Sequence, residues 1–237
     1  MGFGKTCLSA AVASLVICET SLLAAGPPLS NSQDLLTLDP SGFARLLKIA
    51  RPMPVSAEDK ARALSSLPEE GEVTNLNTAA RRKLAALGEV LRPNDRDGVY
   101  EIKVIAVPQA AVALHARAVI LISEAALTLL DADELQALIA HEIGHEYVWT
   151  ERERAFSLAD RNGLKDLELV CDAIAIVTLH GLGMDMSRLM TAVQKISRYN
   201  QQFGTATNEK DYPTVAERRA FARAVGAWLS VRTTATR

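Results

Sequence analysis

The stretch His141-Glu142-Ile143-Gly144-His145 decides how this chain is interpreted. Residues four apart share one face of a helix, so both imidazoles can reach a single metal ion. Glu142 lies about 100° further round the helix than His141, which places it beside that ion and outside its ligand set. The pattern predicts a metal-activated water with its own proton acceptor, which is the core of a zinc peptidase.

The residues before this motif predict a helix that contains it. Asp131 is a good N-cap, and Glu134 three residues later completes a capping box. Apolar residues then follow at helical spacing, namely Leu135, Leu138, Ile139 and Ile143. Gly144 costs such a helix about 1 kcal/mol relative to alanine, which favours the close passage of another element. The alternative is a chance pattern in an unrelated helix.

A third ligand is predicted on a second, mostly apolar helix over residues 164–177. Glu168 and Asp172 are again four apart, and two carboxylates on one buried stripe need a cation to offset their desolvation. Glu168 would bind the metal, and Asp172 would accept the free ring N–H of a ligand histidine. The alternative is that both carboxylates point to solvent from an amphipathic helix.

Together the two motifs resemble the gluzincin peptidases, and more closely the zinc metallopeptidases of family M48. The likeness rests on the HEIGH motif and on Glu168-x-x-x-Asp172-Ala173, and it extends over residues 99–225. It implies His141, His145 and Glu168 as ligands of one Zn²⁺ ion. It also implies Glu142 as the catalytic base and Asp172 as the carboxylate that orients a histidine.

Segments on both sides of the two helices extend the resemblance. Residues 110–114 and 119–123 match the edge-strand hairpin of the family. The segment Tyr212-Pro213-Thr214-x-x-Glu217-Arg218 resembles the family's His-Pro-x-Thr-x-x-Arg.

The chain departs from the family pattern at three places. Tyr212 stands where the family often has histidine; it is a candidate donor to the oxyanion, or a packed aromatic at a helix start. Residues 115–117 replace a glycine-rich hairpin turn. Cys171 replaces alanine and points away from the Glu168–Asp172 stripe, so we expect a small core residue there, with a fourth metal ligand as the alternative.

Length and composition favour one globular domain. The chain has 237 residues, 49% of them hydrophobic, and a formal net charge of −2, so we expect no nucleic-acid partner. The predicted fold class is α+β: a mainly helical, zincin-like metallopeptidase domain with a small antiparallel sheet or edge hairpin beside the HEIGH helix. This domain is expected over residues 41–230, with a helical part at 41–95 and a catalytic core at 99–230.

The amino terminus predicts export. Lys5 precedes an apolar run, and Ala24-Ala25-Gly26 follows as a cleavage site, so residues 1–25 are interpreted as a signal peptide and residues 26–40 as a tether. We therefore expect a periplasmic or cell-envelope protein. An uncleaved membrane anchor at the amino terminus is the alternative, and it is the one route by which we expect membrane association.

The expected activity is zinc-dependent endopeptidase cleavage of cell-envelope proteins, with Glu142 as base. The expected partner is a protein or peptide substrate in extended conformation, added to an exposed strand; an ordinary sheet edge is the alternative. A secreted, chaperone-like zinc-binding module without turnover is the rival function.

We interpret Glu151-Arg152-Glu153-Arg154 as a solvated, self-paired helix face, and the polar segment 200–211 as a loop long enough to cover the site.

Overall fold

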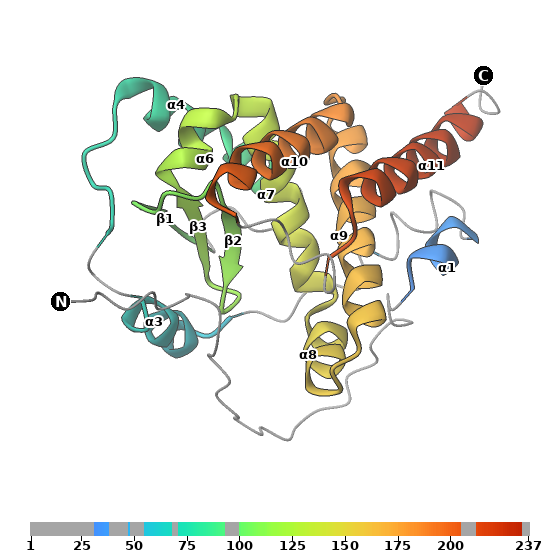
Figure 1. The fold of residues 1–237 in the computed structure, drawn as a ribbon, viewed down its shortest axis with the longest axis horizontal. Helices are drawn as coiled ribbons and strands as arrows, with labels where there is room; N and C mark the ends of the chain where they lie inside the picture. Colours follow the sequence, from blue (N-terminus) through green and yellow to red (C-terminus); the bar gives the residue numbers. More distant parts are fainter. Residues whose placement is uncertain are drawn as a thin grey trace.

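The computed structural model describes residues 31–37, 47, 55–67, 71–92, 100–204 and 212–233 (Figure 1). The expected signal peptide at 1–25 and residues 205–211 of the polar loop lie outside the described residues. The start of the expected helical part, residues 41–51, also lies outside them, except for residue 47. Helices dominate the rest, together with one three-stranded sheet, which confirms the α+β class. The helices are α1 Ser32–Thr37, α3 Ala57–Ser65, α4 Thr78–Ala86, α5 Gly88–Leu91, α6 Glu124–Leu129, α7 Ala132–Tyr147, α8 Trp149–Ser157, α9 Arg161–Gly181, α10 Ser187–Asn200 and α11 Val215–Thr233, with a short 3₁₀ turn η2 Gln201–Phe203.

The sheet consists of β1 Glu101–Ile105, β2 Val112–His115 and β3 Val119–Ser123, in the order β1-β3-β2. It is mixed, whereas we expected an antiparallel sheet: β2 pairs antiparallel with β3, but β1 pairs parallel with it. β3 is central, and four of its five residues are buried, which explains its continuous apolar sequence. β2 lies at an edge of the sheet, as the edge-strand resemblance implied.

The turn between β2 and β3 forms without glycine. Ala116 and Arg117 both have positive φ angles, of 45° and 60°. Two such residues in succession at the centre of the turn from His115 to Ala118 match the backbone twist of the flanking strands, and glycine or asparagine usually occupies these places. Closure of the hairpin by the bond from Ala118 N to His115 O, at 3.0 Å, therefore carries some backbone strain in this chain.

The HEIGH helix α7 is the centre of the fold. The predicted capping box is confirmed, since the Asp131 carboxylate accepts from Glu134 N and the Glu134 carboxylate accepts from Asp131 N, both at 2.9 Å. Twelve of its sixteen residues are buried. The helix lies between β2 on one side and α9 on the other, while α10 packs on it as well (Figure 1).

The helix predicted over 164–177 is longer than expected and spans Arg161–Gly181. It crosses α7 at Gly144, where a Cβ atom would lie 2.8 Å from Cys171 Cα and 3.0 Å from its Cβ. No side chain fits between helices at that separation, so Gly144 permits the close passage that its place in the motif predicted.

The segment interpreted as a tether contains structure. Residues 32–37 form α1, which packs on α9 and α11. Ser32 is fully buried, its backbone N–H donates to Asp166 Oδ2 at 2.8 Å, and its hydroxyl donates to Asp166 Oδ1. This pairing, together with burial of Leu35, holds the segment on the domain, so the description as a tether is wrong for residues 32–37.

The last helix, α11, also begins with a capping box. Thr214 N donates to Glu217 Oε2 at 2.6 Å, and Glu217 N donates to Thr214 Oγ1 at 3.2 Å, which completes the capping box before α11.

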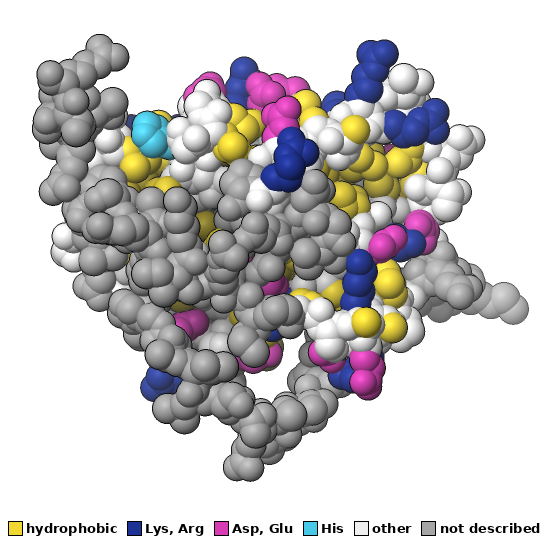
Figure 2. All heavy atoms as spheres, turned by 180° about the vertical axis from the view of Figure 1, so that it is seen from behind, with side chains coloured by type: hydrophobic (Ala, Val, Ile, Leu, Met, Phe, Trp, Pro, Cys, Tyr) yellow, Lys and Arg dark blue, Asp and Glu magenta, His cyan; other side chains and the backbone are white. Residues whose placement is uncertain are grey.

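Within the described residues, no helix is both long and apolar enough to cross a bilayer. On the face shown in Figure 2, basic and acidic side chains of the described residues lie interspersed.

We predict that Gly144→Ala destabilises the protein by about 1–3 kcal/mol, because the added methyl group forces α7 and α9 apart. Gly226→Ala in α11 is the matched control, since a Cβ there meets nothing within 4 Å. The control should unfold at the wild-type urea concentration or slightly above it. Equal urea midpoints for the two variants would show that the helix crossing tolerates a side chain.

Candidate active site

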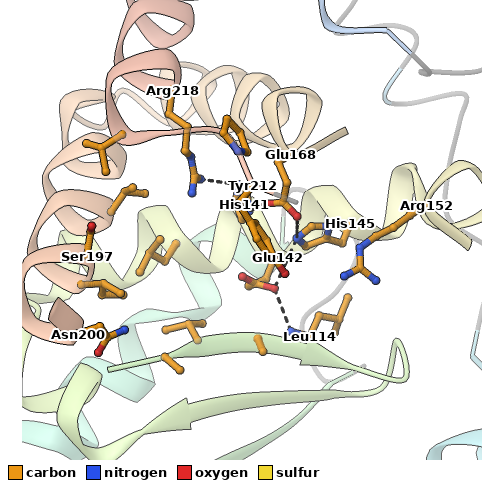
Figure 3. Close-up of a pocket in the computed structure, with 18 of the residues that line it drawn as sticks. Leu114, His141, Glu142, His145, Arg152, Glu168, Ser197, Asn200, Tyr212 and Arg218 are labelled. Carbon is orange, nitrogen blue, oxygen red and sulfur yellow. Dashed lines mark hydrogen bonds and ion pairs between the residues drawn. The ribbon is translucent and has the colours of Figure 1, made fainter. Parts of the chain in front are cut away.

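His141, His145 and Glu168 converge at the crossing of α7 and α9 (Figure 3). His141 Nε2 lies 3.3 Å from Glu168 Oε2, and His145 Nε2 lies 3.7 Å from Glu168 Oε1. One ligand atom from each residue lies within 4.8 Å of the other two, and all three residues are buried. The two histidines share a face of α7, with ring centroids 5.1 Å apart and ring planes at 88°. The structure thus brings together the three expected metal ligands.

Asp172 contacts the ring nitrogen of His141 that faces away from Glu168. The Nδ1 atom of His141 lies 2.9 Å from Asp172 Oδ1, so the expected contact between this carboxylate and a histidine ring is present. Because that carboxylate accepts the Nδ1 proton, Nε2 is the ring nitrogen that faces Glu168 and is left to bind a metal. Asp172 is fully buried.

Arg218 of α11 compensates the charge of Asp172, a role that the sequence did not assign. It donates to Asp172 through Nε at 2.8 Å and through Nη2 at 2.5 Å. Burial alone would raise the pKa of Asp172, but the Arg218 charge and the hydrogen bonds from His141 and Arg218 hold it at about 2. The resemblance at Tyr212–Arg218 was the available signal, since it places an arginine one turn into the last helix.

Cys171 holds the second histidine. Its Sγ lies 3.4 Å from His145 Nδ1, so the sulfur takes the place that a carboxylate takes beside His141. The residue is fully buried, as expected of a core residue. The sequence did not predict its contact with His145, which arises because the close crossing of the helices at Gly144 brings Cys171 onto that ring. Burial raises the pKa of this thiol, which favours the neutral form.

The two histidines have opposite protonation tendencies without a metal. Burial lowers the pKa of His141, but hydrogen bonds to Asp172 and Glu168 outweigh it and raise the value to about 9. Burial lowers the pKa of His145 to about 4, and the charge of Glu168 does not compensate. Burial raises the pKa of Glu168, yet its hydrogen bond with His141 and the charges of both histidines hold it at about 2. Without a metal, the positive charge of protonated His141 therefore offsets the negative charges of the neighbouring carboxylates.

Glu142 borders the cluster without joining it. Its Oε2 atom lies 4.0 Å from His145 Nε2 and accepts a hydrogen bond of 2.9 Å from the backbone N–H of Leu114, on the free edge of β2. Burial raises the pKa of Glu142 to about 7, against the opposing charge of His141. A carboxylate with a pKa near neutrality can both accept a proton and return it.

A cavity of about 300 Å³ opens over these residues and extends along β2 (Figure 3). Its walls come from β2, α7, α8, α9, α10, the start of α11 and the residues just before it. Tyr212 lines it with 37% of its surface exposed, so this phenol faces the site from a position just before the last helix. Burial, followed by the charge of Glu168, raises its pKa.

Arg152 also lines this cavity, which corrects its interpretation as part of a solvated, self-paired face. α8 begins at Trp149 directly after α7 ends, and Arg152 is placed on the side of the site that carries His145 (Figure 3). No local signal in the sequence could have placed it, because the break between α7 and α8 at Val148 separates Arg152 from the helical phase of His145.

A protein-family comparison now identifies the chain. The model of peptidase family M48 matches residues 77–201, which is more than half of the chain. The protein belongs to family M48. It is therefore a metallopeptidase of the zinc-dependent type, and the resemblance recognised in its sequence is confirmed. The comparison with curated proteins found no match.

The matched range of this M48 peptidase contains the HEIGH motif, Glu168 and Asp172, but it ends before Tyr212 and Arg218. The assignment of those two residues to the site therefore depends on the structure, which places both on the wall of the same cavity.

The donor set of this M48 peptidase fits zinc. Zinc takes imidazole nitrogen and carboxylate oxygen, and a catalytic site has three protein ligands with one position left open. Two imidazoles and one carboxylate converge here, and in the part of the chain that the structure describes no further His, Cys, Asp or Glu joins them. The buried Glu168 carboxylate also requires a cation, which zinc would supply.

Proposed function

We propose that this M48 metallopeptidase is an endopeptidase that binds extended protein segments along β2 and uses Glu142 as its base. The observation that carries the proposal is the cavity in which the edge strand, Glu142 and the His141–His145–Glu168 cluster meet. When bound to these three residues, zinc supplies a Lewis acid that polarises the scissile carbonyl and makes water acidic.

The free edge of β2 supports binding of an extended chain. Ala113 is paired with Leu121, while Ala111 O accepts from Ser123 N and His115 O accepts from Ala118 N. Backbone groups alternate between the two sides of a strand, so Val112 and Leu114 direct theirs to the cavity. The Leu114 N–H already donates to Glu142, so an extended substrate can pair with the backbone of Val112 and the C=O of Leu114 and bring its scissile bond beside Glu142.

The placement of Glu142 supports its role as base. Leu114 N–H occupies its Oε2 atom and fixes the carboxylate, which leaves Oε1 to take a proton from the attacking water. The same oxygen can then return that proton to the leaving amine. Tyr212 faces the same space, and its O–H can donate to the oxyanion that forms on the substrate carbonyl.

The endopeptidase proposal predicts different losses for two variants that both keep zinc. Glu142→Gln should lower kcat on an unfolded protein substrate by about 10²–10⁴-fold, because the amide cannot accept the proton. Tyr212→Phe should lower kcat by roughly 10²-fold with little change in KM, because a single donor to the transition state is lost. Cleavage is followed by mass spectrometry, with and without a chelator, and zinc content is measured in parallel. Wild-type turnover by Glu142→Gln would exclude Glu142 as the base.

We also propose that the protein acts on proteins of the cell envelope. The support is the basic, apolar and small-residue order of residues 1–26, which is typical of an export signal. The expected mature chain then begins near residue 26. Amino-terminal sequencing of protein recovered from its native cell tests this, and a cytoplasmic protein that begins at Met1 would contradict the proposal.

A further inference from the structure

The two ends of the active-site cavity differ in chemistry. The end beside α10 and α11 is lined by the aliphatic side chains of Leu138, Val193, Ile196 and Val215. The opposite end, where α8 begins, presents Trp149 and the guanidinium of Arg152 (Figure 3). A peptide that lies along β2 therefore meets an apolar wall on one side of the cluster and a cation on the other.

Arg152 has no ion-pair partner among the described residues, although it is half-buried at the cavity wall. Its neighbour Arg117 differs, because that side chain packs over Trp149 and pairs with the buried Glu146 at 3.1 Å. Arg152 interacts instead with the neutral phenol of Tyr212, and its charge lowers the pKa of His145. A guanidinium has five N–H donors and matches a carboxylate with two parallel hydrogen bonds. The cation thus faces the substrate space with its capacity for a carboxylate unused.

The direction of β2 decides which part of a substrate reaches Arg152. The strand begins beside α10, where Ala110 N donates to Asn200 Oδ1 at 2.8 Å, and it ends toward Trp149 and α8. Antiparallel pairing is the more stable arrangement per residue. A substrate antiparallel to β2 enters from the α8 end, so residues that precede the scissile bond lie beside Arg152.

We infer that Arg152 selects substrates with an Asp or Glu side chain among about three residues on the amino-terminal side of the cleaved bond. The inference rests on the proposed function, because it assumes that an extended peptide occupies the cavity. It adds a substrate class: polypeptides with an acidic residue before the scissile bond and an aliphatic residue after it.

Matched peptides test the inference. Peptides of one sequence carry Glu, Gln or Lys at each of the three positions on either side of a fixed cleavage site, and kcat/KM is measured by mass spectrometry. The wild type should prefer Glu over Gln by about fivefold at one of the preceding positions, the range of a partly exposed ion pair. Arg152→Gln should reduce this ratio to about one, Arg152→Lys should restore part of it, and Arg152→Glu should favour Lys. Arg154→Gln is the control, because Arg154 is exposed on the same helix and should keep the wild-type ratio.

A binding measurement separates this inference from the proposed function. Fluorescence anisotropy of the same peptides on the zinc-loaded Glu142→Gln protein should give the same order of Glu, Gln and Lys, and that order should be lost when Arg152→Gln is added. Absence of cleavage by the wild type, with this binding order intact, contradicts the peptidase proposal and supports the inference. A Glu/Gln ratio near one, a ratio that survives Arg152→Gln, or a preference after the cleaved bond overturns the inference and leaves the peptidase proposal intact.

Discussion

The close crossing of α7 and α9 is the constraint on which the active site depends. At Gly144 and Cys171 the helices approach so closely that a single Cβ would collide with the backbone. That approach brings Glu168 to the two histidines and buries most of the surface of all three side chains. Burial in turn forces each charge to find a partner, since an isolated ion in such a place is costly.

The partners form a continuous chain from α11 to the centre of the cavity. Arg218 neutralises Asp172, Asp172 orients His141, and His141 meets Glu168. The second histidine is held differently, by the neutral Cys171 sulfur. One histidine is therefore backed by a charged pair and the other by a polarisable neutral group, so the two are unequal before any metal binds. Their pKa values, about 9 and about 4, express the same difference.

Local signals in the sequence predicted the parts of the fold that depend on near neighbours. The capping box at Asp131, the strand at 119–123 and the pairing of residues four apart on α7 and α9 all follow from short-range spacing. Contacts between distant elements could not be read in this way. The parallel pairing of β1, the sulfur of Cys171 on His145 and the turn of Arg152 into the cavity depend on how elements cross, and helical phase alone does not fix that.

X-ray absorption at the zinc edge of the purified, zinc-loaded protein tests the central claim most directly. The account predicts one zinc ion with two imidazole nitrogens and oxygen donors, and no sulfur scatterer at about 2.3 Å. In Glu168→Ala the zinc content should fall. A sulfur ligand from Cys171, or a full zinc complement in Glu168→Ala with an unchanged spectrum, would contradict the proposal that two crossing helices build this site.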